Sequence, residues 1–168
     1  MTICEQNIKT FLFRHIDQWS GLQADCNKSE VLELFPFIQG EGITHTGLKN
    51  VEYQFRSLQF GGFLEPIFFY FFRDRLSYIK TEFWSFDERE CADIIRHLGM
   101  PAQRLEFAWQ GQRKADWEWL YPEKGIAIGV IPSTGLIASV TVFSPCTVNL
   151  YKDNYWNTKV SREFRLSD

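Results

Sequence analysis

Residues 117–145, WEWLYPEKGIAIGVIPSTGLIASVTVFSP, carry the clearest structural signal in the sequence. They predict two strands, Trp117 to Ile131 and Leu136 to Phe143, joined by the turn Pro132-Ser133-Thr134-Gly135. β-Branched and aromatic residues, which favour strands, fill both arms, while Pro and Gly stand where a turn needs a preset or a positive φ. Because four residues are too few for a parallel crossover, the two strands are expected to pair in antiparallel fashion.

Large rings alternate with other side chains at the start of this stretch. A strand period of two predicts that Trp117, Trp119 and Tyr121 share one face, with Glu118 and Leu120 on the other. The rings can be core beneath a helix, or a surface that recognises a protein partner, since interfaces favour Trp and Tyr. For the second interpretation, carboxylates beside the rings form an acidic rim, and the expected partner-binding residues are Trp117, Trp119, Tyr121, Asp116, Glu118 and Glu123.

Helix signals lie upstream of this stretch. Apolar residues recur with helical spacing between Ile8 and Trp19, which predicts one amphipathic helix within residues 1–21 that ends near Gly21. Two reciprocal capping boxes, Asn27-Lys28-Ser29-Glu30 and Asp87-Glu88-Arg89-Glu90, stand 60 positions apart (87 − 27).

The spacing of the boxes suggests an internal repeat. The candidate units, residues 27–86 and 87–145, each read as a helix followed by three strands. The expected strands are Val51 to Leu58, Phe63 to Phe72 and Leu76 to Phe86 in the first unit, and Leu105 to Trp109, Trp117 to Ile131 and Leu136 to Phe143 in the second. The Gly-rich segment 40–47 is expected to be a loop, because it lacks the Lys and the following helix of a phosphate-binding loop.

The prediction is therefore an α+β fold in one compact domain, residues 1–168, with an antiparallel sheet or sheets, helices on one side and two tandem αβββ units. A single α+β domain whose elements alternate similarly is the alternative. Residues 146–168 are expected to form a C-terminal tail strapped onto the domain.

The amino-acid composition limits the kinds of partner that are expected. The net charge is −3, from 18 basic and 21 acidic residues, which does not favour nucleic-acid binding and suits a neutral or basic partner. Aromatic residues make up 17% of the chain, and such a surplus tends to appear at ligand or partner surfaces.

The cysteines and the N-terminal sequence predict the compartment. The four cysteines, at positions 4, 26, 91 and 146, show no CxxC spacing, and we expect free buried thiols in a reducing cytoplasm. Charged residues interrupt the first 19 residues, so we expect no secretory signal, and the longest apolar run, Ile67 to Phe72, is too short to span a membrane.

Residues 87–145 resemble the αβ unit shared by β-lactamase inhibitor proteins and the outer-membrane assembly lipoprotein BamE. The resemblance rests on Leu98-Gly99-Met100-Pro101 closing a helix, on a following strand with Trp119 and Tyr121, and on a hairpin through Gly135. It implies a non-enzymatic binder whose sheet presents aromatic residues to a partner. The overall character is also similar to that of bacterial toxin-immunity proteins.

Motifs for catalysis, metal binding and cofactor binding are weak. The sequence has no Gly-x-Ser-x-Gly, His-Glu-x-x-His or Walker motif, so we expect no catalytic residues, no metal and no cofactor. Asp93 and His97 have the i, i+4 spacing of an acid–base pair, but a solvated helix surface is the simpler interpretation.

Three functions remain open from the sequence. The first is a non-enzymatic cytoplasmic protein that neutralises a protein partner, most concretely a bacterial toxin immunity or inhibitor protein, with no nucleic-acid or membrane partner. The second is a small-molecule binder or enzyme that uses a cavity lined by Asp93, His97 and the Trp residues. The third is a structural subunit of a larger assembly.

Overall fold

The computed structural model describes residues 2–12, 21–22, 26–34, 38–48, 51–60, 67–82, 86–108 and 115–153. Their elements, in chain order, are α1 (Ile3–Leu12), α2 (Lys28–Leu34), β1 (Ile38–Leu48), β2 (Val51–Phe60), β3 (Ile67–Phe72), β4 (Arg75–Glu82), α3 (Glu88–Leu98), β5 (Gln103–Ala108), β6 (Ala115–Tyr121), the 3-10 turn η2 (Pro122–Lys124), β7 (Ile126–Val130), β8 (Ile137–Phe143) and α4 (Val148–Tyr151). The α+β class predicted from the sequence is confirmed.

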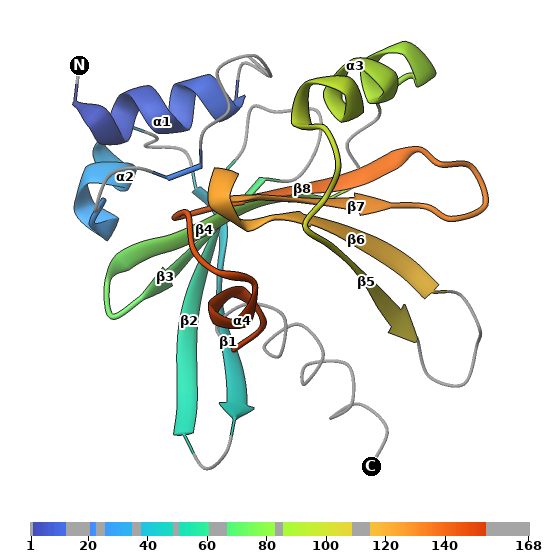
Figure 1. Ribbon diagram of the computed structural model, residues 1–168. Helices are drawn as coiled ribbons and strands as arrows, with labels where there is room; N and C mark the ends of the chain where they lie inside the picture. The colour runs from blue at the N-terminus through green and yellow to red at the C-terminus, as the bar shows by residue number, and fades with distance from the viewer. Residues whose placement is uncertain are drawn as a thin grey trace.

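All eight of these strands form one sheet in the order β1-β2-β3-β4-β8-β7-β6-β5. Every neighbouring pair is antiparallel, and for β7 and β8 this was expected from the four-residue turn that joins them. Each half of the chain is a meander of four strands, and the two meanders meet where β4 pairs with β8 (Figure 1). The predicted antiparallel pairing is therefore confirmed, and of the predicted sheet or sheets the structure shows a single one.

Each half contains one more strand than predicted. In the first half the added strand is β1, which includes the Gly-rich segment 40–47, so the expectation of a loop there was wrong. β1 pairs with β2 along its length, from Ile38 opposite Phe60 to Leu48 opposite Val51. β-Branched residues lie between the glycines, and pairing across the whole ladder outweighs the weak strand preference of glycine.

In the second half the added strand comes from dividing the predicted strand Trp117 to Ile131. The chain forms β6, then turns at η2, then returns as β7. Pro122 begins this turn, and Gly125 ends it in the left-handed conformation with φ 66°. Pro and Gly at the first and last positions of a turn are the usual arrangement, and the β7–β8 hairpin shows the same pattern in the sequence.

Both predicted capping boxes form. In the first, the Glu30 amide donates to Asn27 Oδ1 at 2.9 Å and the Asn27 amide donates to Glu30 Oε2 at 2.8 Å. The second box has the same two bonds between Asp87 and Glu90, at 2.8 and 3.0 Å. These boxes fix the starts of α2 and α3, each of which leads into a four-stranded meander.

Apolar side chains fill two layers, one on each face of the sheet. The larger layer lies beneath α1, α2 and α3 and includes Ile8, Ile94 and Ile128, all fully buried (Figure 1). The second layer lies on the opposite face, where Tyr151 of α4 packs with Phe143, their ring centroids 4.7 Å apart. The three longer helices thus share one side, as predicted, while α4 covers part of the other.

A disulfide joins Cys4 of α1 to Cys26, which precedes α2. The expectation of free thiols was therefore wrong for these two residues, because the fold brings their Cα atoms to 5.6 Å. Cys91 and Cys146 are free, as predicted. Of the helix predicted within residues 1–21, α1 is confirmed with Ile8 in the core, and positions 13–20 lie outside the described residues.

Candidate partner-binding surface

Strand β6 carries the alternating aromatic rings, and its described side chains alternate between the two faces of the sheet as predicted. Trp119 and Tyr121 belong to the layer beneath the three longer helices, whereas Leu120 belongs to the layer beneath α4. The side chains of Trp117 and Asp116 lie outside the described residues, although their backbone is part of β6. The structure therefore describes four of the six expected partner-binding side chains.

Tyr121 is part of the core and supports the end of α3. It is buried, and its hydroxyl donates a hydrogen bond to the Gly99 carbonyl at 3.0 Å. Lys124 completes the same end, because its Nζ donates to the Leu98 carbonyl at 3.0 Å. The last carbonyls of a helix have no partner within the helix, so these side chains satisfy them. Burial raises the pKa of Tyr121, and the nearby Arg104 opposes that shift.

Trp119 is half-buried, and an arginine covers its ring. The Arg104 guanidinium carbon lies 4.6 Å from the ring centroid, and the two residues are direct cross-strand partners in the β5–β6 ladder. Another part of the indole packs against the core. The buried Nε1–H has no hydrogen-bond partner among the described residues. One part of the Trp119 ring therefore packs in the core and another part is exposed, so its position fits both the core interpretation and the partner-surface interpretation.

Glu118 lies on the opposite face and is buried, with 5% of its surface exposed. It accepts a hydrogen bond from the Tyr151 hydroxyl of α4. Burial, followed by the adjacent Glu118 carboxylate, raises the pKa of Tyr151 well above its usual value. Glu118 therefore ties α4 to the sheet and does not stand on an exposed rim in this structure. Glu123, in η2, is exposed.

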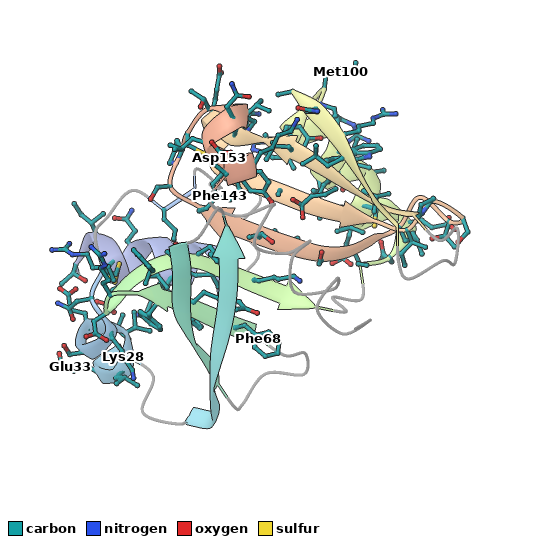
Figure 2. All side chains as sticks on the ribbon, turned by 90° about the horizontal axis from the view of Figure 1, so that it is seen from below. Lys28, Glu33, Phe68, Met100, Phe143 and Asp153 are labelled. Atoms are coloured by element: carbon teal, nitrogen blue, oxygen red, sulfur yellow. A yellow bond between two sulfur atoms is a disulfide. The ribbon has the colours of Figure 1, made fainter. Side chains whose placement is uncertain are left out.

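Two exposed residues in the segment that runs from the end of α3 into β5 were not among the expected partner-binding residues. Met100 follows the end of α3 and is 88% exposed, and Figure 2 places it at the periphery of the molecule. Arg104 on β5 is also exposed. In the sequence, Met100 stands out only as part of the Leu-Gly-Met-Pro corner that closes a helix. Arg104 can be assigned to Trp119 only from the β5–β6 register. We call Met100, Arg104 and Trp119 the Met100–Trp119 surface.

The possible acid–base pair on α3 does not form. Asp93 and His97 are both exposed, and the Asp93 carboxylate instead accepts a hydrogen bond from Arg96 Nη1 at 2.8 Å. Since α3 buries Cys91, Ile94 and Leu98, the exposed residues Asp93 and His97 cannot line a cavity shared with the core side of Trp119. The solvated-surface interpretation is confirmed for this pair.

Within the described part of the chain, no group of three or more His, Cys, Asp or Glu side chains is arranged to hold a metal ion. None of the helices described is long and apolar enough to cross a membrane. Of the predicted C-terminal tail, residues up to 153 are described and form α4 against the sheet, and the remainder lies outside the described residues.

Comparisons with known proteins give no family. No family model matches the chain, and no curated protein sequence matches it. Among solved structures, the chain is similar to a cysteine-rich secretory protein from Staphylococcus aureus, at 13% identity and a TM-score of 0.43. The match covers 80% of this chain and 47% of that protein, so the chain spans about half of its length.

Proposed function

We propose that this chain is a non-enzymatic binding protein that neutralises a protein partner, most concretely an immunity protein that blocks a bacterial toxin domain. The observation that carries the proposal is the Met100–Trp119 surface, where an exposed Arg lies over a half-buried Trp and an exposed Met precedes that Arg by four positions. Trp, Met and Arg are enriched at the centres of protein interfaces, and Trp and Arg dominate binding hot spots.

The geometry of this surface suits recognition. Stacking on the indole restricts Arg104, so less side-chain entropy is lost when its guanidinium binds an acceptor. Tyr121 and Lys124 hold the corner that precedes Met100 by binding the last carbonyls of α3. The net charge of −3 and the exposed Glu123 favour a partner that is neutral or basic overall, with an acceptor group opposite Arg104.

Capture from the native host tests the proposal. Tagged protein is used to isolate a partner, and affinity is then compared among the wild type, Met100→Ala and Leu150→Ala. Leu150 is the matched control, because it is also a large exposed side chain but lies on α4, on the other face of the sheet. Met100→Ala is expected to weaken binding by roughly 1–2 kcal/mol without lowering the thermal midpoint, whereas Leu150→Ala leaves both unchanged.

Trp119→Ala requires a stability measurement beside the affinity, because part of the ring is core. A surface role predicts that partner binding falls by about 2 kcal/mol or more beyond any effect of reduced folding. A binding loss fully explained by unfolding, or a partner that binds all three variants equally, removes the Met100–Trp119 surface from the proposal. Failure to isolate any protein partner removes the function itself.

The compartment is part of the same proposal. The cytoplasm was expected from free thiols, but the Cys4–Cys26 bond favours an oxidising compartment, because disulfides rarely persist in the cytosol. Protein alkylated at harvest from the native host distinguishes the two locations. Four alkylated cysteines support the cytoplasm, and two support an oxidising compartment.

A further inference from the structure

Strand β5 is the last strand at one end of the sheet, so one of its two edges faces away from the sheet. Within the described part of the chain β6 is its only strand neighbour. An edge strand presents unpaired backbone N–H and C=O groups that can pair with another strand. Natural edges are commonly blocked by Pro or Lys, and β5, with the sequence QRLEFA, contains neither.

The sequence of β5 is complementary to itself in one antiparallel register. If two copies pair symmetrically about Leu105, Arg104 of each copy stands opposite Glu106 of the other. Opposite charges placed directly across an antiparallel ladder stabilise the pair, and the symmetry makes this contact twice. A shift of the centre by one residue in either direction removes the match, so charge selects this register.

The position of Arg104 supports the same arrangement. Arg104 is exposed and lies over Trp119, its cross-strand partner on β6. Positions 104 and 106 share a face of the strand, so in this register position 106 of a second copy would stand opposite Arg104 on the face that carries Trp119.

We propose that two copies of this chain associate through antiparallel pairing of their β5 edges, centred on Leu105, which joins their sheets into one. The contact resembles the addition of a strand to an exposed sheet edge in peptide recognition. Six residues on each side form a small interface, so the dimer is concentration-dependent and weak, with a dissociation constant in the micromolar range or above. The dimer shares Arg104 with the Met100–Trp119 surface but does not rest on the proposed function, because self-association is measured without a partner.

Sedimentation of the full chain from micromolar to near-millimolar concentration tests the proposal. The wild type is expected to dimerise, and Arg104→Glu and Glu106→Arg are each expected to raise the dimer dissociation constant roughly tenfold or more by placing like charges opposite each other. Combining the two substitutions restores the opposite-charge pairs and returns the constant to near the wild-type value. Arg96→Glu is the matched control, because Arg96 is an exposed arginine on α3, outside β5, and its variant should dimerise as the wild type does.

Two further measurements make every result decisive. Near-ultraviolet circular dichroism confirms that each variant is folded, and hydrogen exchange at low and high protein concentration reports on the β5 amides, which should gain protection with concentration. A chain that stays monomeric overturns the proposal, as does a dimer that is insensitive to both single substitutions. Weakening by the single substitutions without recovery in the double variant also overturns it.

Discussion

The hydroxyl of Tyr151 donates a hydrogen bond to the buried carboxylate of Glu118, and this bond joins α4 to the face of the sheet opposite α3. Among the described side chains, Glu118 is the only charged one that is buried. A buried carboxylate is stable only when donors compensate for its lost hydration. The short helix α4 is therefore held by a polar contact as well as by the packing of its ring on Phe143.

Tyr151→Phe should lower the free energy of unfolding by about 1–3 kcal/mol, because it removes a donor from a buried carboxylate while keeping the ring. Urea unfolding measures the change. Leu150→Ala is the control on the same helix, and it should change stability little because Leu150 is 49% exposed. Equal effects of the two substitutions would contradict a stabilising role for the hydrogen bond.

Stability should fall at alkaline pH, and Tyr151 should account for much of the fall. Its pKa is raised in the folded state by burial and by Glu118, so the contribution is complete below the unfolded pKa of about 10 and is lost as pH rises through the higher folded value. Tyr121 acts in the same direction, since burial raises its pKa too. Urea unfolding between about pH 8 and pH 11 should give a shallower loss for Tyr151→Phe than for the wild type. Parallel curves would show that Tyr151 is not responsible.

Two glycines with similar backbone angles should respond very differently to alanine. Gly125 has φ 66°, and a Cβ there would fall on the Phe143 carbonyl oxygen, whereas Gly135 has φ 71° and nothing within 4 Å. Gly135→Ala should cost about 1–2 kcal/mol from the left-handed backbone alone. Gly125→Ala adds a backbone clash and should lower the thermal midpoint much further, or prevent folding. Similar midpoints for both variants would be inconsistent with the close approach of β8 to Gly125.

Thiol titration in denaturant should find two reactive cysteines, Cys91 and Cys146, before reduction and four after it. Replacing Cys4 and Cys26 together by Ser should lower the free energy of unfolding by about 3 kcal/mol, the value typical of a loop of this size. Cys146→Ser is the control, because that thiol is free and only partly buried. Four thiols without reductant would disprove the bond.

Asp93→Ala and His97→Ala should leave partner binding and stability nearly unchanged. Both side chains are exposed on α3, and the Asp93–Arg96 pair is a surface contact of a kind that contributes little. Binding and thermal unfolding of the two variants are the measurements. Loss of biological activity in either variant without loss of structure would instead support an enzyme.

The sequence predicted most of the fold because its signals were local. The capping box at Asp87, the hairpin after Ile131 and the alternation of Trp119 with Leu120 each depend on a few neighbouring residues. β1 was missed because its glycines weaken every local strand signal and pairing with β2 compensates for them. The division at Pro122 was missed because apolar residues continue on both sides of that turn.

The surface could be predicted only in part, since exposure depends on contacts distant in sequence. Trp119 was identified from its residue type and strand spacing, but its neighbour Arg104 follows from the β5–β6 register. Glu118 was expected at an exposed rim, yet α4, more than 30 residues later, buries it. The Cys4–Cys26 bond depends on where α1 lies, which periodicity does not determine.

A single ladder joins the two meanders, from Tyr78 opposite Phe143 to Glu82 opposite Ser139. This connection sets an order of folding events. Within each meander, successive strands are connected along the chain and close short loops, whereas β4 and β8 are separated by α3 and three other strands. Long loops close at a greater entropic cost, so this ladder is expected to form after the two meanders. Its amides should then exchange with solvent when the two halves separate, at a free energy below that of global unfolding, and the rate-limiting step of folding should be the meeting of two preformed halves.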